Sequence, residues 1–422
     1  MRFPTRLLLL PLLISLPHRA QLGAQAAPAS SPTPGSVDGI PVSIRWNRLV
    51  PAFAQEAAAA RRAARIAAAG DSASLRRIAQ TPPAILFRVY TILSVAQYAA
   101  LGAAKDGRDV PAEAAIAGAS AAVLTELFTD STVRASIARE LARDLERART
   151  GSRAAERATT GKRLGEDVAR RVIAWAPPLD FTATWKGSIP TGPGMWSSAR
   201  GVPPMGVGLA SSRGWLLDSA SRFRPAAPPK FGSPEFDAAL EEVRRVARAR
   251  TPEQLTIARR WNIADPWEPW NETAVAALLR HRVSDAEAVR VLALLNAASS
   301  DAVIACFESK YHYWTIRPSQ ADTTLALADS IGLPNFPSYP SGHACSAGAF
   351  DAVLGHFLPQ DRAEFTRIAE EQAMSRLYGG IHYRFDNEIG LALGRAVARH
   401  AIERERRGGL NVWRGAGVAR SP

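Results

Sequence analysis

The sequence contains little cysteine or lysine, and it has no long uninterrupted apolar run after its first residues. Its cysteines are Cys306 and Cys345, so at most one intramolecular disulfide can form. The absence of alternating apolar and polar residues excludes a sheet-based fold. The mature chain has no stretch of ~18 uninterrupted apolar residues, so we expect a soluble protein without a transmembrane segment. Lysine is much rarer than arginine, which draws attention to Lys310.

The N-terminus is typical of an export signal. Residues 1–26 begin with Arg2 and Arg6, continue through the apolar run Leu7 to Leu16 and end at Ala24-Gln25-Ala26, a small-residue cleavage site. We therefore predict an exported protein, periplasmic or extracellular. Residues 27–40 predict a disordered linker of Ala, Pro and Ser.

The chain is basic, with a formal net charge of +13. Removal of the signal takes away Arg2, Arg6 and Arg19, which leaves +10 (13 − 3). An excess of basic residues often indicates that the partner is a nucleic acid or an anionic membrane. The arginines here are scattered through Ala-rich segments, so we expect most of them to lie on solvent-exposed faces of helices. We expect a minority of them to attract anions to one pocket. We predict no nucleic-acid partner and small-molecule substrates.

Segments of helical period predict an all-α fold, a helical bundle in two halves. The N-terminal half covers residues 41–176, with helices expected at Ala52–Ala69, Ala84–Ala104, Pro111–Phe128, Ser131–Arg149 and Ala154–Trp175. A connecting segment rich in Pro, Gly and Trp covers 177–232, a catalytic helical domain covers 233–406, and a tail covers 407–422. In the catalytic domain we expect a turn at Trp267–Trp270, a helix at Asn271–His281 and a closing helix at Asn387–Glu403.

Three short polar signatures interrupt the second half: K-Y-H-Y-W-T-I-R-P from Lys310, Y-P-S-G-H from Tyr339 and S-R-L-Y-G-G-I-H-Y-R-F-D from Ser375. Lys310 and Arg317 are seven residues apart, so both can project from one helical face. The proline after Arg317 places that residue at a helix end.

The second signature predicts a helix N-terminus that can bind an anion. Ser341 is a suitable N-cap, and Gly342 lets the backbone approach a ligand closely. The third signature adds Arg376 and, after a Gly-Gly break, His382. Asp386 follows one turn later and can accept a hydrogen bond from one ring nitrogen of His382. The other ring nitrogen then carries a free lone pair.

These residues form the inventory of a site for a tetrahedral oxyanion. The predicted oxyanion-binding groups are Lys310, Arg317, Ser341, Gly342 and Arg376. The predicted catalytic residues are His343, His382, Asp386 and Lys310.

The three signatures resemble the superfamily of vanadium-dependent haloperoxidases and type 2 phosphatidic-acid and acid phosphatases, whose pattern is K-x6-R-P, P-S-G-H and S-R-x5-H-x3-D. For a haloperoxidase the resemblance implies a vanadate cofactor with His382 as its ligand, His343 as acid–base partner and Lys310 assisting peroxide activation, so that halide is oxidised. For a phosphatase it implies no cofactor, His382 as the nucleophile that forms phosphohistidine, and His343 as the acid that protonates the leaving alcohol.

We favour the haloperoxidase, because the chain is far longer than soluble bacterial acid phosphatases and Phe336 stands where chloroperoxidases have phenylalanine. Phe307 argues against this, since chloroperoxidases usually have tryptophan there. The alternatives are a secreted phosphatase and a non-catalytic oxyanion-binding protein, although a binding protein would need neither His343 nor His382.

For Cys306 and Cys345 we favour two buried thiols over a disulfide. The halide, the organic substrate and the oligomeric state stay open.

Overall fold

The computed structural model describes residues 39–68, 86–106, 109–149, 152–180, 183–199, 202–262, 266–329 and 331–410. The predicted export signal, nearly all of the predicted linker and most of the predicted tail lie outside these residues. From Ile40 onward the chain forms one compact unit. No strand occurs in the part that the structure describes, and the all-helical fold predicted from the sequence is confirmed.

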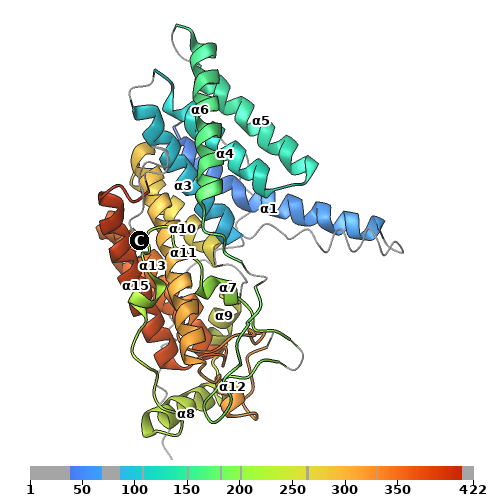
Figure 1. Cartoon of the computed structure of the whole chain (residues 1–422), viewed down its shortest axis with the longest axis vertical. Coiled ribbons are helices and arrows are strands. Elements are labelled where there is room, and N and C mark those ends of the chain that lie inside the picture. The colour runs from blue at the N-terminus through green and yellow to red at the C-terminus, as the bar shows by residue number, and fades with distance from the viewer. Residues whose placement is uncertain are drawn as a thin grey trace, which may run out of the picture. The chain divides into compact units, whose positions relative to one another are not determined.

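The N-terminal helices pack around α4 (Figure 1). They are α1 (Val42–Ala67), α3 (Leu86–Lys105), α4 (Ala112–Leu127), α5 (Ser131–Arg147) and α6 (Ala154–Trp175). Small residues allow α4 and α6 to approach closely, because a Cβ on Gly118 would lie 2.4 Å from the Lys162 carbonyl oxygen and one on Gly165 would lie 2.0 Å from that of Ala115. The packing of α4 against α6 therefore requires glycine at both positions.

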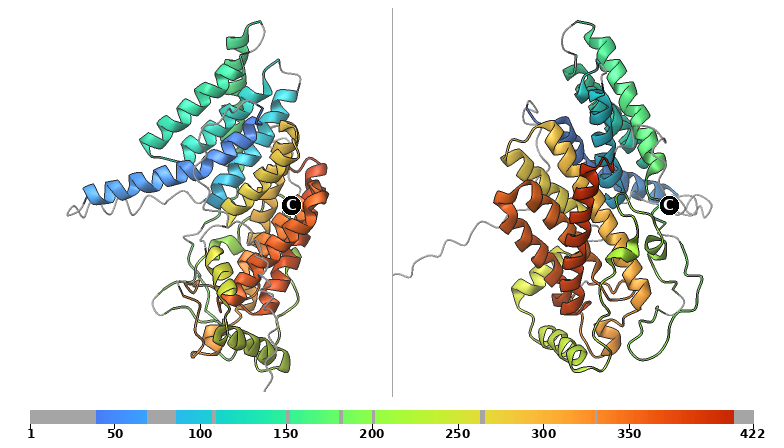
Figure 2. Two further views of the ribbon diagram at one scale, coloured as in Figure 1. Left: turned by 180° about the vertical axis from the view of Figure 1, so that it is seen from behind. Right: turned by 60° about the vertical axis from the view of Figure 1, so that its left-hand side comes forward.

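The C-terminal helices are arranged around α13, and α11 is the longest helix in the described chain. They are α8 (Pro234–Arg248), α9 (Pro252–Arg260), α10 (Trp267–Arg280), α11 (Asp285–Tyr313), α12 (Pro318–Ala321), α13 (Gly342–Phe357), α14 (Arg362–Tyr378) and α15 (Arg384–Arg406). Helix α11 contacts α13 and α15 on one side and α3 on another, as the two views of Figure 2 also show. It therefore joins the N-terminal helices to the helices that carry the signatures.

The connecting segment lies along α11. The described part of this segment contains two short helices, α7 (Val207–Ala210) and η1 (Ala220–Phe223). The buried carboxylate of Asp301 accepts hydrogen bonds from the backbone N–H groups of Trp215 and Leu216, both at 2.7 Å. Farther along α11, the ring of Trp185 stacks on that of Tyr311 with centroids 5.7 Å apart. These contacts hold the segment against the helix that ends beside Lys310.

Two helices, α3 and α11, are long and apolar enough to cross a membrane by length and composition alone, among the residues described. The most apolar windows of these helices are 78% and 94% buried inside the protein. Core helices of water-soluble proteins pass the same length and composition test, so this finding is weak as an indication of membrane insertion.

Three predicted helix starts are wrong. Helix α1 begins at Val42 and continues through Pro51, because buried side chains from Val42 to Phe53 lie on both sides of that proline and outweigh its local cost. The predicted turn at Trp267–Trp270 is the first turn of α10, in which both tryptophans are buried. Helix α15 begins at Arg384 instead of Asn387, which places Asp386 in its first turn.

Candidate active site

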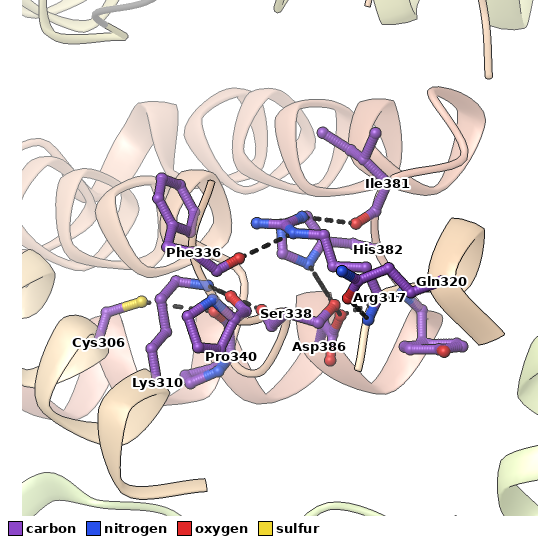
Figure 3. Close-up of polar contacts among 12 residues, drawn as sticks. Cys306, Lys310, Arg317, Gln320, Phe336, Ser338, Pro340, Ile381, His382 and Asp386 are labelled. Atoms are coloured by element: carbon purple, nitrogen blue, oxygen red, sulfur yellow. Dashed lines mark hydrogen bonds and ion pairs between the residues drawn. The ribbon is translucent and has the colours of Figure 1, made fainter. Parts of the chain in front are cut away.

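The three signatures meet where four helices end or begin. Lys310 lies in the last turn of α11, Ser341 precedes α13, Arg376 lies in the last turn of α14, and Asp386 lies in the first turn of α15. Figure 3 shows Lys310, Arg317, His382 and Asp386 gathered around the loop that carries Phe336, Ser338 and Pro340. The tertiary structure thus brings together residues more than 70 positions apart in the chain.

Lys310 is fully buried. Its ammonium group donates to the carbonyl oxygens of Pro337 and Ser338, both at 2.8 Å, and lies 5.0 Å from the centre of the Phe336 ring. Burial lowers the pKa of Lys310 to about 8, because a charged amine is poorly solvated there. The charged form of this lysine would be stabilised by a nearby anion.

Arg317 does not share a helical face with Lys310, in contrast to the prediction. Helix α11 ends at Tyr313 because Trp314 adopts a left-handed conformation with φ 51°. Arg317 is extended before Pro318, with φ −84° and ψ 156°, as the proline predicted. The arginine thus reaches the site from beyond the helix instead of from its surface.

The Arg317 side chain is fully buried and only partly satisfied. It donates from Nε to the Phe336 carbonyl at 3.0 Å and from Nη1 to the Ile381 carbonyl at 2.8 Å. Its Nη2 atom is buried and makes no hydrogen bond among the described residues. Burial lowers the pKa of Arg317 to about 10. A buried guanidinium with an unused donor is suited to an anionic ligand.

Arg376 is the third buried cation. Its Nε donates to the Ser375 hydroxyl at 3.0 Å, and Nη2 lies 3.4 Å from the Ala258 carbonyl oxygen. Burial lowers its pKa to about 10. The charges of Lys310, Arg317 and Arg376 all lower the pKa of His382, and among the described residues the carboxylate of Asp386 lies within this cluster. A buried excess of positive charge is costly and favours binding of an anion.

Ser341 occupies the predicted N-cap position of α13, but its hydroxyl does not cap the helix. Its Oγ atom is buried and makes no hydrogen bond among the described residues. A Cβ on the next residue, Gly342, would meet no heavy atom within 4 Å. Open space at a helix N-terminus, with the unused donors of Ser341 and Arg317, fits a tetrahedral oxyanion such as vanadate or phosphate.

The hydrogen bond predicted between His382 and Asp386 is present: Nδ1 of His382 lies 2.8 Å from Oδ2 of Asp386. Burial pushes the pKa of His382 well below its usual range, and the charges of Arg317, Lys310, Arg376 and His343 add to this effect. The ring is therefore neutral at neutral pH, with its proton on Nδ1 and a lone pair on Nε2. Nε2 lies 3.4 Å from Nη1 of Arg317.

Asp386 is fully buried, which raises its pKa to about 6 against the opposing effects of the Ser338 hydrogen bond and the charge of Lys310. The Ser338 hydroxyl donates to Oδ2 of Asp386 at 2.6 Å, and the Tyr383 N–H donates to the same atom at 3.2 Å. The sequence analysis missed Ser338. The sequence feature that could have indicated its role is its position three residues before Ser341, in the loop between the first and second signatures.

His343 follows Gly342 in the first turn of α13 and is close enough for its charge to lower the pKa of His382. His343 therefore lies near His382, at the N-terminus of the helix that Ser341 precedes. Cys306 and Cys345 are buried and free, in agreement with the favoured interpretation.

Residues 289–407 match the model of the PAP2 superfamily. The vanadium-dependent bromoperoxidase of Ascophyllum nodosum is 32% identical over 115 residues, which covers 20% of this chain and 21% of that protein. The lipid A 1-phosphatase of Rhizobium johnstonii is 41% identical over 70 residues, which covers 17% of this chain and 29% of that protein. The chain thus spans less than a third of the length of these curated relatives.

The similarity of fold extends farther than the similarity of sequence. A crystal structure of a bacterial vanadium-dependent iodoperoxidase matches with a TM-score of 0.64 at 22% identity, covering 77% of this chain and 92% of that one. An apo bacterial vanadium-dependent chloroperoxidase matches with a TM-score of 0.63 at 12% identity, covering 77% and 94%. These matches show a shared fold, and residues 289–407, which carry the complete set of signatures, are similar to the PAP2 superfamily.

Proposed function

We propose that this protein is a vanadate-dependent haloperoxidase, an enzyme that oxidises halide with hydrogen peroxide. The observation that carries the proposal is the buried, positively charged site around Gly342, with unused donors on Arg317 and Ser341 beside the Nε2 lone pair of His382. Vanadate, when bound, supplies a Lewis-acidic centre that activates peroxide without a change in its own oxidation state.

Each residue has a physical task in this proposal. Nε2 of His382 would ligate vanadium, because the bond from Nδ1 to Asp386 keeps that lone pair available. Lys310, Arg317 and Arg376 would neutralise the oxygens of the anion, the arginines as forked donors. His343 would hold and release the proton of an oxygen bound beside the helix N-terminus.

The extent of the fold similarity favours a haloperoxidase over a phosphatase. The matches to vanadium-dependent peroxidases cover 77% of this chain and nearly all of those structures, including helices outside the signatures. The match to lipid A 1-phosphatase is confined to 70 residues. Helices far from the signatures are not needed for anion binding, so their shared arrangement adds weight to the haloperoxidase.

A PAP2-type phosphatase is the second candidate, because the 41% identity to lipid A 1-phosphatase is higher than that to the bromoperoxidase. In that enzyme class His382 would attack phosphorus and His343 would protonate the leaving alcohol. The same cations would stabilise the equatorial oxygens of the transition state. A third candidate, a non-catalytic oxyanion-binding protein, would use the cations and Ser341 alone.

The deciding experiment uses the metal-free protein with and without orthovanadate. Peroxide-dependent halogenation of a phenol-type dye with chloride, bromide or iodide is followed beside hydrolysis of p-nitrophenyl phosphate. Halogenation that requires vanadate, with hydrolysis that vanadate suppresses, is the expected result. Rapid hydrolysis without any halogenation would identify a phosphatase, and binding of vanadate without either reaction would identify a binding protein.

Histidine variants test the assigned roles. His382→Ala and His343→Ala should each abolish the observed activity, whereas His356→Ala, which alters a histidine that contacts Arg406 at 3.2 Å on the far end of α13, should retain it. Activity that persists in both site variants would show that the site is misplaced. Export, predicted from residues 1–26, is tested separately by N-terminal sequencing of the protein recovered outside the cytoplasm.

A further inference from the structure

Two thiols lie directly beside the candidate site. Cys306 is one turn before Lys310 on α11, and Cys345 is two residues after His343 on α13. Both are fully buried and free, and both contact the same loop: Sγ of Cys306 lies 3.5 Å from the Pro340 carbonyl oxygen, and the Cys345 N–H donates to the Ser341 carbonyl oxygen at 2.9 Å. Helices α11 and α13 pack against each other along this region. Figure 3 shows Cys306 next to Pro340 and Lys310.

The thiol pair is connected to the loop that binds the anion. Sγ of Cys306 donates to the carbonyl oxygen of Pro340 at 3.5 Å, and the next residue is Ser341. The backbone of Cys345 is held from the other side by α15, since a Cβ on Gly394 would lie 2.0 Å from the Cys345 carbonyl oxygen. These contacts hold Sγ of Cys306 and the backbone of Cys345 in place, and neither cysteine takes part in the proposed reaction.

The charges around the pair favour ionisation of one thiol. Burial opposes a thiolate at Cys306, but the neighbouring Cys345 thiol and the positive charges of Lys310 and Arg317 outweigh it, so the pKa of Cys306 is lowered. Burial and the neighbouring sulfur raise the pKa of Cys345. One thiol is thus the better nucleophile, and the other keeps its proton, as in a dithiol with an attacking and a resolving cysteine.

We propose that Cys306 and Cys345 form a redox dithiol that hydrogen peroxide converts to a disulfide between α11 and α13. The Cys306 thiolate attacks one peroxide oxygen, the O–O bond breaks, and a sulfenic acid and hydroxide form. The Cys345 sulfur then attacks the Cys306 sulfur, the S–S bond forms, and the sulfenic oxygen leaves as water. Overall, two thiols are oxidised, one peroxide is reduced, and two waters are produced.

The disulfide would act on the neighbouring site through two contacts. It joins the helix of Lys310 to the helix of His343, and it removes the S–H that Cys306 donates to the Pro340 carbonyl. Loss of that donor leaves a buried carbonyl oxygen unsatisfied next to Ser341, and we expect oxyanion affinity to fall roughly two- to fivefold. The inference does not depend on the proposed function, because a phosphatase or a binding protein with this chain would carry the same thiols.

The test treats the folded full-length protein with hydrogen peroxide in the absence of vanadate and halide. We expect the intact mass to fall by about 2 Da and thiol titration in denaturant to fall from two thiols to none. Peptide mapping should find Cys306 joined to Cys345, and tungstate affinity measured by calorimetry should fall on oxidation and recover with dithiothreitol. Two persistent thiols, or separate oxygen adducts on each cysteine, would overturn the dithiol, and an unchanged tungstate affinity would overturn its coupling to the site.

Single variants are the matched controls. Cys345→Ala should leave Cys306 to gain oxygen without a crosslink, and Cys306→Ala should leave Cys345 largely unreactive. If either variant fails to fold, the rate of disulfide formation in native wild-type protein is compared with the rate in urea. A pair held together by the fold reacts faster in the native protein, so equal rates would contradict the proposal.

Discussion

The hydroxyl of Ser338 and the ring of His382 share one acceptor, Oδ2 of Asp386, at 2.6 Å and 2.8 Å. The backbone carbonyl of Ser338 also accepts a hydrogen bond from the Lys310 ammonium at 2.8 Å. Ser338 therefore connects the residue that orients the histidine with one of the three buried cations. A single serine in the loop before Ser341 sets the relative positions of both groups.

Replacement of Ser338 by Ala should lower activity by ~10- to 100-fold, the usual effect of losing a group that orients a ligating histidine. The Ser338 hydroxyl stabilises the ionised form of Asp386, so its loss should raise the pKa of Asp386 above about 6 and move the acid limb of the pH–rate profile to higher pH. Rates measured across the acid range check this. Ser94→Ala, which alters a buried serine whose hydroxyl donates to the Tyr90 and Thr91 carbonyls of its own helix α3, should leave the profile unchanged.

Gly342→Ala should reduce oxyanion affinity by about tenfold or more without loss of stability. The added methyl group meets no protein atom within 4 Å, so it enters the space assigned to the anion, and alanine is tolerated in the first turn of a helix. Calorimetric binding of tungstate and thermal unfolding measure the two effects. The contrasting variant is Gly348→Ala, whose Cβ would lie 2.2 Å from the Leu391 carbonyl oxygen and should destabilise the protein. Unchanged affinity in Gly342→Ala would place the anion elsewhere.

Oxyanion affinity should fall as pH rises through about 8, the lowered pKa of Lys310 in the free protein. An anion stabilises the charged lysine and raises its pKa, so binding above that pH requires uptake of a proton and weakens by up to about tenfold per pH unit. Tungstate is the suitable probe, because it stays a dianion throughout this range. The decrease should be absent in Lys310→Met, and an affinity independent of pH in the wild-type protein would contradict the role of Lys310.

Protein stability should decrease as pH rises towards about 7 because of Asp301. Burial raises its pKa from 3.8 to about 7, against the opposing hydrogen bonds from the backbone of Leu216 and Trp215. Because the pKa of Asp301 is higher in the folded than in the unfolded protein, its protonated form stabilises the fold. This stabilisation is complete below the pKa of the unfolded state and is lost as the pH rises through the pKa of the folded state. Between about pH 5 and about pH 8 the free energy of unfolding should fall by about 3 kcal/mol from this group. Urea unfolding of wild-type protein and Asp301→Asn checks this, since the variant should lose that part of the pH dependence.

Helical periodicity was sufficient to predict the all-helical fold and the ends of several helices. The side chains of Ser233, Thr251 and Ser284 each accept a hydrogen bond from the first turn of the helix that follows, as serine and threonine commonly do at an N-cap. The start of α1 was not predictable in this way. Its first residues are held by burial against distant helices, and burial is not visible in a local window.

The sequence by itself determined which chemical groups the candidate site contains, because the three signatures specify three cations, two histidines, a carboxylate, a serine and a glycine at fixed spacings. It also determined the bond between His382 and Asp386, since residues four apart are neighbours on one turn. The tertiary structure decided that Arg317 approaches from outside α11, that Ser338 joins the site and that Cys306 and Cys345 contact the same loop. These relationships depend on the packing of α11, α13, α14 and α15, and contacts between segments far apart in the chain follow from packing and not from local residue pattern.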